Sequence, residues 1–280
     1  MRSYSDRQAK EMRNRVFRHM LKKRGWKYKV FLRYLCFFKY AAFAPVRGRF
    51  LESYYTLMRY LDDVVDGDAP LPQPYHHESD YVADKIRFSE NPEAPNDEVD
   101  FLMAYCFELA ERFGADFKAE TKDILESLFF DAQRRGKLMI FPQEVLNHHF
   151  HLLDIRGTIR ATLKVFREDP EQYPLLEPLG MACRYQYDIE DYEADIAAGY
   201  VNISQEECDL FGILHEDLDD TSSPGVKAWL HHRAKEGMKL LEEHHRLLRQ
   251  GKFSWLSRGT FRFVYEMPAR KVFRHILLRP

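Results

Sequence analysis

The chain alternates apolar residues at helical spacing with short polar loops that contain proline or glycine. Apolar positions three and four apart predict helices, and no run longer than a few residues alternates as a half-buried strand would. The predicted helices cover residues 5–24, 26–44, 48–66, 97–113, 115–137, 142–166, 174–198, 226–250 and 253–278, with loops at 70–77, 89–96 and 221–225. The sequence therefore predicts an all-α fold.

The helix predicted at 48–66 ends in a cluster of carboxylates. Asp62 and Asp66 lie one turn apart on one face, with Asp63 beside them and Arg59 one turn earlier. Anions in the last turn of a helix face the negative end of its macrodipole, at a cost of ~0.3–1 kcal/mol each when exposed. A compensating cation is therefore expected, and oxygen ligands of this kind suit Mg²⁺. A solvated acidic helix end is the alternative for this stretch alone.

A second acidic stretch ends the helix predicted at 174–198. Asp188, Asp191 and Asp195 follow i, i+3, i+7 spacing and so share a face, and Gly199 closes the helix. Two acidic helix ends, each with an aspartate pair four residues apart, suggest opposing walls of one metal-diphosphate site.

With both acidic stretches in view, the chain resembles the squalene/phytoene synthase family of head-to-head trans-prenyl transferases. Residues 59–66 resemble the family's first motif, an Arg followed by D-D-x-x-D, and residues 191–204 resemble its second, D-x-x-x-D followed by Gly. Residues 154–160 stand where the family has a small-residue helix segment, and residues 40–45 match its early segment ending in Pro. The resemblance implies a single-domain class I isoprenoid synthase bundle with a central cavity, spanning residues 1–280.

The resemblance also implies a reaction and a site. The expected enzyme is a Mg²⁺-dependent transferase that ionises an allylic prenyl diphosphate, farnesyl or geranylgeranyl, and condenses it head to head with a second one. The catalytic carboxylates would be Asp62, Asp66, Asp191 and Asp195. The same four, with Asp63 and Asp188, would bind the metal. Candidate substrate-binding side chains, chosen partly because cations pair with phosphate, are Arg59, Lys39, Arg156, Arg160, Tyr187 and Arg262.

The chain also departs from the family pattern. Arg184, Tyr187 and Glu190 stand where the second motif usually carries Gln, Asn and Arg, and residues 36–39 replace an early Ser-x-Ser-Phe. These changes leave the metal-binding face intact but alter the side that would receive a second substrate.

Two arginines define the main alternative to head-to-head condensation. Arg156 and Arg160 replace small residues that leave room for a prenyl chain in the family. If they point inward, they would block the second substrate channel, and the protein would be a single-substrate terpene synthase or cyclase. A third hypothesis is a non-catalytic relative that binds lipid or a partner protein, although two retained aspartate pairs are hard to explain without metal chemistry.

Charge is distributed unevenly along the 280 residues, although the net charge is only −2. Residues 1–49 hold 15 Lys/Arg against 2 Asp/Glu, and residues 251–280 hold 7 against 1. Aromatic and basic residues interleave at 26–35, a pattern suited to peripheral contact with an anionic membrane. No nucleic-acid module accompanies the basic ends, so no nucleic-acid partner is expected. Oligomeric state is not indicated.

Several function classes and compartments are disfavoured. The four cysteines have no C-x-x-C or zinc-like spacing and are expected to be free thiols, and the histidines lack the H-x-x-x-H pairing of a zinc site. P-loop, G-x-G-x-x-G and G-x-S-x-G motifs are missing from the sequence. Neither a long apolar run nor the apolar core of a signal peptide occurs, which predicts a cytoplasmic protein.

Overall fold

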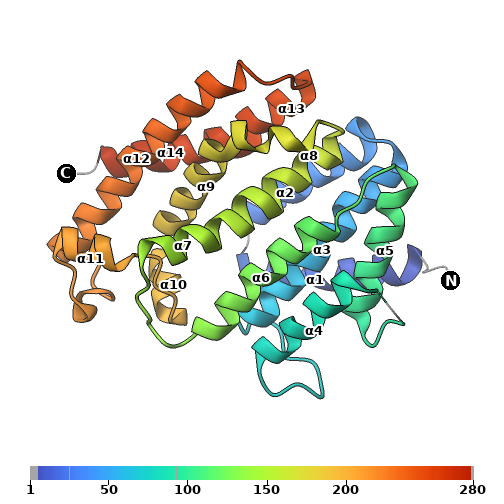
Figure 1. The fold of residues 1–280 in the computed structure, drawn as a ribbon, viewed down its shortest axis with the longest axis horizontal. Helices are drawn as coiled ribbons and strands as arrows, with labels where there is room; N and C mark the ends of the chain where they lie inside the picture. The colour runs from blue at the N-terminus through green and yellow to red at the C-terminus, as the bar shows by residue number, and fades with distance from the viewer. Residues whose placement is uncertain (1–5, 25, 93, 279–280) are drawn as a thin grey trace. The chain divides into compact units, whose positions relative to one another are not determined.

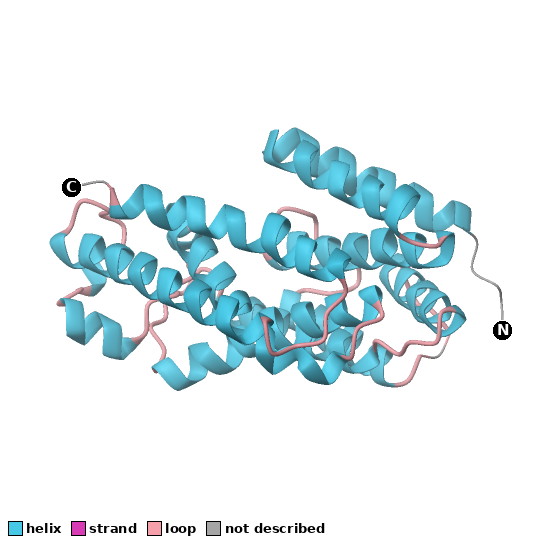
Figure 2. Ribbon diagram, turned by 90° about the horizontal axis from the view of Figure 1, so that it is seen from above, coloured by secondary structure: helices cyan, strands magenta, loops and turns pink. Residues whose placement is uncertain are grey.

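The computed structural model describes residues 6–24, 26–92 and 94–278. These residues form helices and loops (Figure 2), and the β pairing among them is an isolated bridge between Phe141 and Ser204. The all-α prediction is confirmed. The chain divides into two compact units, Met1–Ala132 and Gln133–Pro280, which are described separately. The single-domain expectation stays a prediction.

Unit 1 is organised around α3, the helix that carries the first acidic stretch. Phe50, Leu57 and Leu61 of α3 are fully buried, and the Phe50 ring lies 4.3 Å from that of Phe117, centroid to centroid. The helix packs against α1, α5 and η1, so its acidic end has a fixed position in this unit. The helices (Figure 1) are α1 (Asp6–Arg24), α2 (Trp26–Phe37), the π-helical η1 (Phe38–Ala42), α3 (Pro45–Val65), α4 (Glu78–Glu90), α5 (Glu98–Arg112) and α6 (Lys118–Arg134), whose last two residues belong to unit 2.

Helix α4 is absent from the sequence-based assignment. Its buried stripe contains Lys85, which is only 1% exposed, and a cation in the core register obscures the apolar pattern. The Lys85 ammonium lies 2.6 Å from carboxylate oxygens of both Asp97 and Asp100. Asp97 also caps α5, because its side chain accepts the backbone N–H groups of Val99 and Asp100.

Unit 2 is organised around α9, the helix that leads into the second acidic stretch. It packs against α12, α14 and η2. Helices α12 and α14 lie side by side (Figure 1), and the Phe273 ring occupies the space where a side chain at Gly237 would project. The elements are α7 (Gln143–Phe150), η2 (His151–Ile159), α8 (Arg160–Phe166), η3 (Pro170–Leu176), α9 (Glu177–Glu190), α10 (Tyr192–Ala198), α11 (Gln205–Phe211), η4 (His215–Asp217), α12 (Pro224–Leu248), α13 (Trp255–Thr260), η5 (Phe261–Glu266) and α14 (Met267–Leu277).

Three of the predicted helices contain π-helical turns, at η1, η2 and η5. The helix predicted at 174–198 is interrupted more strongly. Its start is a 3₁₀ helix, η3, and α9 ends at Glu190 because Asp191 adopts φ −106° and ψ 6° before α10 begins. The second acidic motif therefore lies at a break between two helices. Asp191 N–H still donates to Tyr187 O, and Asp195 N–H to Asp191 O, so helical spacing persists across the break.

Within the described residues, none of the helices combines the length and apolar character needed to cross a bilayer.

Candidate active site

The acidic end of α3 is held together by an arginine. Arg59 reaches Asp62 with Nη1 2.6 Å from Oδ2, and its Nε donates to Asp63 Oδ1 at 2.8 Å. The Asp63 side chain is 4% exposed and that of Asp62 is 38% exposed. Asp66 is the C-cap of α3, and Gly67 follows at φ +73°. The structure therefore brings Arg59, Asp62 and Asp63 together, and one cation partly offsets the unfavourable placement of two anions.

Lys39, a predicted diphosphate ligand, lies on η1. Its Nζ donates to Glu52 Oε2 at 2.6 Å, and Arg13 donates to the same oxygen at 2.7 Å. The approach of η1 to α3 is close, because a Cβ atom at Gly48 would lie 2.8 Å from Lys39 Cα. Binding of Lys39 to phosphate would therefore compete with Glu52.

The acidic break in unit 2 centres on Asp195. Asn202 Nδ2 donates to Asp195 Oδ2 at 3.0 Å. Burial, together with the negative charges of Asp188 and Asp191, raises the pKa of Asp195 to about 7, although Arg184 and Arg134 act in the opposite direction. A carboxyl group in such surroundings is ionised at neutral pH only in part unless a further cation arrives.

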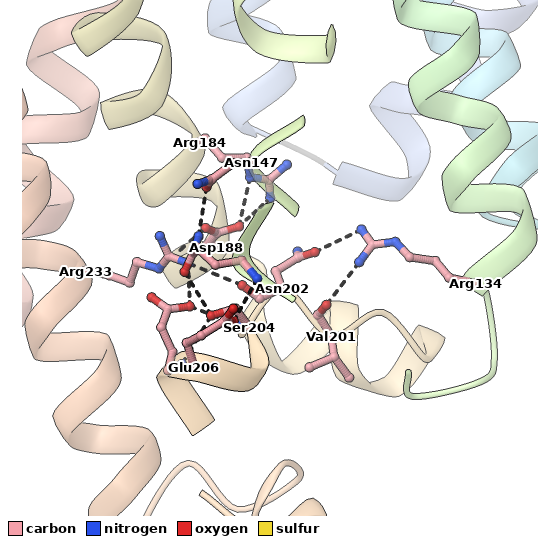
Figure 3. A network of polar contacts seen from close by, with 11 residues as sticks. Arg134, Asn147, Arg184, Asp188, Val201, Asn202, Ser204, Glu206 and Arg233 are labelled. Atoms are coloured by element: carbon pink, nitrogen blue, oxygen red, sulfur yellow. Dashed lines mark hydrogen bonds and ion pairs between the residues drawn. The ribbon is translucent and has the colours of Figure 1, made fainter. Parts of the chain in front are cut away.

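Asp188 lies between two arginines (Figure 3). Arg184 Nε donates to Asp188 Oδ1 at 2.8 Å, and Arg233 Nε lies 4.0 Å from Oδ2. Arg233 is 2% exposed, donates to Glu207 Oε2 at 3.0 Å, and has its guanidinium carbon 4.2 Å from the ring centroid of Tyr185. Asp188 therefore already has two cationic neighbours.

Arg134 fixes Asn202 from the other side. The Arg134 side chain is 4% exposed. It donates to the Val201 carbonyl at 3.1 Å and to Asn202 Oδ1 at 2.9 Å (Figure 3). Asn202 is thus oriented by Arg134, which leaves its amide nitrogen directed at Asp195.

Two backbone hydrogen bonds place the segment after α6 against the end of α10. Gly136 N–H donates to Ala198 O at 3.0 Å, and Leu138 N–H donates to Gly199 O at 3.1 Å. Gly199 has φ +85°, and a Cβ atom there would lie 2.3 Å from Gly136 Cα. Only glycine meets both conditions without rearrangement.

The remaining predicted residues lie elsewhere in unit 2. Arg160 Nη2 donates to Glu171 Oε1 at 2.7 Å, and the Glu171 side chain is 67% exposed. Arg156 is half-buried on η2, and Tyr187 is 47% exposed on α9. Arg262 is exposed on η5, 5.7 Å from the ring centroid of Phe263.

The site also contains residues that sequence reasoning did not select, namely Arg134, Asn202, Glu207 and Arg233. Arg233 had a detectable signal, because it lies four residues after Trp229 in the buried stripe of α12. A cation in a core register needs a partner. Asn202 lies three residues after the glycine that closes the second motif.

The donor groups fit magnesium in type. Within the described part of the chain, no group of three or more His, Cys, Asp or Glu side chains is arranged to hold a metal by itself. Mg²⁺ usually takes one or two protein carboxylates and completes its octahedron with water and phosphate oxygens. The raised pKa of Asp195 marks a carboxylate whose charged form a divalent cation would stabilise.

Comparison with known proteins identifies the fold. No family model and no curated protein matched the sequence. Among solved structures, squalene synthase HpnC from Alicyclobacillus acidocaldarius is similar, with a TM-score of 0.69 and 14% identity, over 98% of this chain and 95% of that one. A dehydrosqualene synthase in complex with ligand has a TM-score of 0.61 and 14% identity, over 96% of each chain. The predicted helical fold of the isoprenoid synthases is therefore confirmed.

Proposed function

We propose that the protein is a Mg²⁺-dependent prenyl transferase that ionises an allylic prenyl diphosphate, farnesyl or geranylgeranyl, and joins it head to head to a second one. The similarity of fold to two such synthases supports the general class. The observation that carries the proposal is the acidic break of unit 2, where a partly buried Asp195 lies near Asp188 and Asp191. Such a cluster is suited to a divalent cation, which would stabilise the charged form of Asp195.

Not all acidic residues have the same proposed role. Asp191 and Asp195 are the proposed metal ligands of the second motif, and Asp62 and Asp66 those of the first. Asp63 and Asp188, which the sequence also suggests as ligands, are ion-paired with Arg59 and Arg184, and their side chains are only 4% and 0% exposed. Asp62 also contacts Arg59, but its side chain is 38% exposed. The proposed role of Asp63 and Asp188 is to hold these arginines in place.

Side chains of the protein would orient the proposed metal ligands and stabilise the negative charge of a bound diphosphate. Asn202 donates to one oxygen of Asp195 and so leaves the other oxygen available. Arg59 and Arg184 provide fixed positive charge beside the proposed ligands, which favours an anionic diphosphate group. Magnesium, when bound, would neutralise the charge that develops on the diphosphate leaving group.

The single-substrate alternative depends on arginines that block a second channel. Arg160 does not favour it, because its guanidinium is paired with the largely exposed Glu171 and lies 5.9 Å from the ring centroid of Tyr173. This contact directs Arg160 towards η3. We therefore retain condensation of two substrates as the proposal.

Product analysis tests the proposal. The purified protein is incubated with Mg²⁺ and farnesyl or geranylgeranyl diphosphate, separately, and pyrophosphate release and extracted products are measured. A C30 or C40 product supports head-to-head condensation. A C15 or C20 hydrocarbon or alcohol would replace it with the single-substrate reaction, and no Mg²⁺-dependent release from either substrate would contradict both.

Matched variants test whether the second acidic motif forms part of the metal site. Asp191→Asn and Asp195→Asn should each lower pyrophosphate release by about 100-fold or more, as expected when charge stabilisation of the leaving group is lost. Asp219→Asn changes an exposed carboxylate of the same unit and should leave release unchanged. Full activity of the Asp191 and Asp195 variants would show that the metal site has been misplaced.

A further inference from the structure

The last helical segment of unit 2 presents apolar side chains to solvent. Phe263 of η5, Met267 of α14 and Leu278, the C-cap of α14, are 55%, 51% and 83% exposed. Positions 267, 271, 274 and 278 are spaced by four, three and four residues and so form one stripe on the helix. Ala269 and Phe273 are fully buried on the other side of α14. Among the described residues, the stripe therefore faces solvent and no other element covers it, whereas the opposite side of α14 packs in the core.

The same stripe is basic. Lys271 and Arg274 lie within it, and Arg262 lies beside Phe263; all three are exposed. In the described residues these cations have no acidic partner, and the Arg262 guanidinium lies over the Phe263 ring. Arg270, outside the stripe, is paired instead with Glu266 at 2.8 Å. Uncompensated positive charge is thus concentrated where the apolar side chains are exposed.

We propose that this stripe, formed by Arg262, Phe263, Met267, Lys271, Arg274 and Leu278, docks on an anionic lipid membrane. Apolar side chains between cations fit the boundary between headgroups and acyl chains, where the cations meet lipid phosphates. A second copy of this chain is a poorer occupant, because a two-fold contact would bring like charges together. The inference does not depend on the proposed reaction.

This surface differs from the one that the sequence suggests. The interleaved basic and aromatic residues at 26–35 include Trp26, Lys27, Tyr28, Val30 and Phe31, whose side chains lie outside the described residues. The stripe on η5 and α14 is defined instead by side chains that are exposed in the structure. Variants that change only the stripe therefore test its membrane binding independently of residues 26–35.

Vesicle co-sedimentation of the full chain tests the proposal. The protein should bind vesicles of phosphatidylcholine mixed with phosphatidylglycerol and bind pure phosphatidylcholine much more weakly. Binding should weaken with added salt, because exposed charges are screened. The triple variant Arg262→Gln, Lys271→Gln, Arg274→Gln should lose roughly 100-fold in affinity, at about fivefold for each cation near the surface.

Two further multiple variants separate the contribution of the apolar side chains to membrane binding from a general effect of charge. Phe263→Ser with Met267→Ser should reduce binding at every salt concentration, because it removes inserted apolar area and no charge. A control with the same change in charge, Lys227→Gln, Lys235→Gln, Lys239→Gln, alters exposed positions of α12 and should bind like the parent. Thermal unfolding of each variant confirms that its fold is intact.

A local readout comes from Trp255, which is 82% exposed on the adjoining α13, whereas Trp229 is fully buried. Its fluorescence should shift to shorter wavelength on anionic vesicles, and Trp255→Phe should remove that shift.

The proposal is overturned if the protein does not bind anionic vesicles at low salt, if the stripe variants bind like the parent, or if the stripe binds RNA in preference to vesicles.

Discussion

At the scale of single residues, His244 is a histidine buried in the core of unit 2. Its side chain is fully buried on α12, and neither ring nitrogen has a hydrogen-bond partner among the residues that the structure describes. Burial lowers its pKa to about 4, although Glu266 acts in the opposite direction and His245 in the same one. The neutral imidazole is therefore the form that the folded state accepts.

Because the pKa of His244 is lower in the folded state than in the unfolded one, acid should destabilise the fold through this residue. The unfolded chain binds the extra proton first, so stability falls as the pH drops from about 6.5 towards about 4, by up to ~1.4 kcal/mol per pH unit. His244→Leu should remove this loss. Its unfolding free energy relative to the parent, measured with urea, should rise from pH 7 to pH 5. A difference that does not change with pH would contradict the assignment, and the exposed His275→Leu controls for loss of a histidine.

Arg233 supports the polar network beneath the acidic break. Arg233→Met should leave the largely buried Glu207 without its cation and lower the unfolding free energy by ~3–5 kcal/mol, measured with urea. Arg233→Lys should recover only part of this loss, because an ammonium cannot stack on Tyr185 as a guanidinium does. Arg246→Met on the same helix changes a side chain that is 64% exposed, and should cost less than about 0.5 kcal/mol. Equal effects of Arg233→Met and Arg246→Met would show that the network is not structural.

At the scale of elements, the contact between Gly136 and Gly199 sets the end of α10. Gly199→Ala should lower the unfolding free energy by ~2–4 kcal/mol, because it adds a clash with the backbone of Gly136 to the strain of a positive φ. Gly212→Ala is a matched control, since Gly212 has φ +64° but no atom of the described residues lies within 4 Å of its Cβ position, so about 1 kcal/mol is expected. Urea midpoints measure both. Similar losses in the two variants would mean that the close approach contributes nothing.

Sequence patterns predicted elements well where local chemistry determines them. Asp97 was predicted to begin a helix and does cap α5, and both acidic stretches were located from the spacing of their aspartates. The patterns failed where contacts with other segments determine whether a helix forms or where it ends. Lys85 obscured α4 because its charge is neutralised by residues of another segment, and no local signal indicated the interruption at Asp191.

The candidate site shows the same limit. The spacing of Asp62, Asp191 and Asp195 selects them. Arg134 and Asn202 are 68 residues apart in sequence, and they meet where the backbone after α6 is hydrogen-bonded to the end of α10. Such contacts between distant segments cannot be read from one sequence. The π-helical turns, which change the register within helices predicted as regular, are equally invisible to a 3.6-residue pattern.

At the scale of the whole molecule, the boundary between the two units falls inside a helix. Unit 1 ends at Ala132, whereas α6 continues to Arg134, which is hydrogen-bonded to Val201 and Asn202. Helix α6 therefore connects the two units without a flexible linker. Unfolding of either unit should fray α6, because the helix has residues in both. We expect one cooperative thermal transition, with calorimetric and van't Hoff enthalpies equal. Arg134→Met should lower the transition temperature without splitting the transition. Two resolved transitions, in the parent or in this variant, would show that the units fold independently and that the single-domain prediction is wrong.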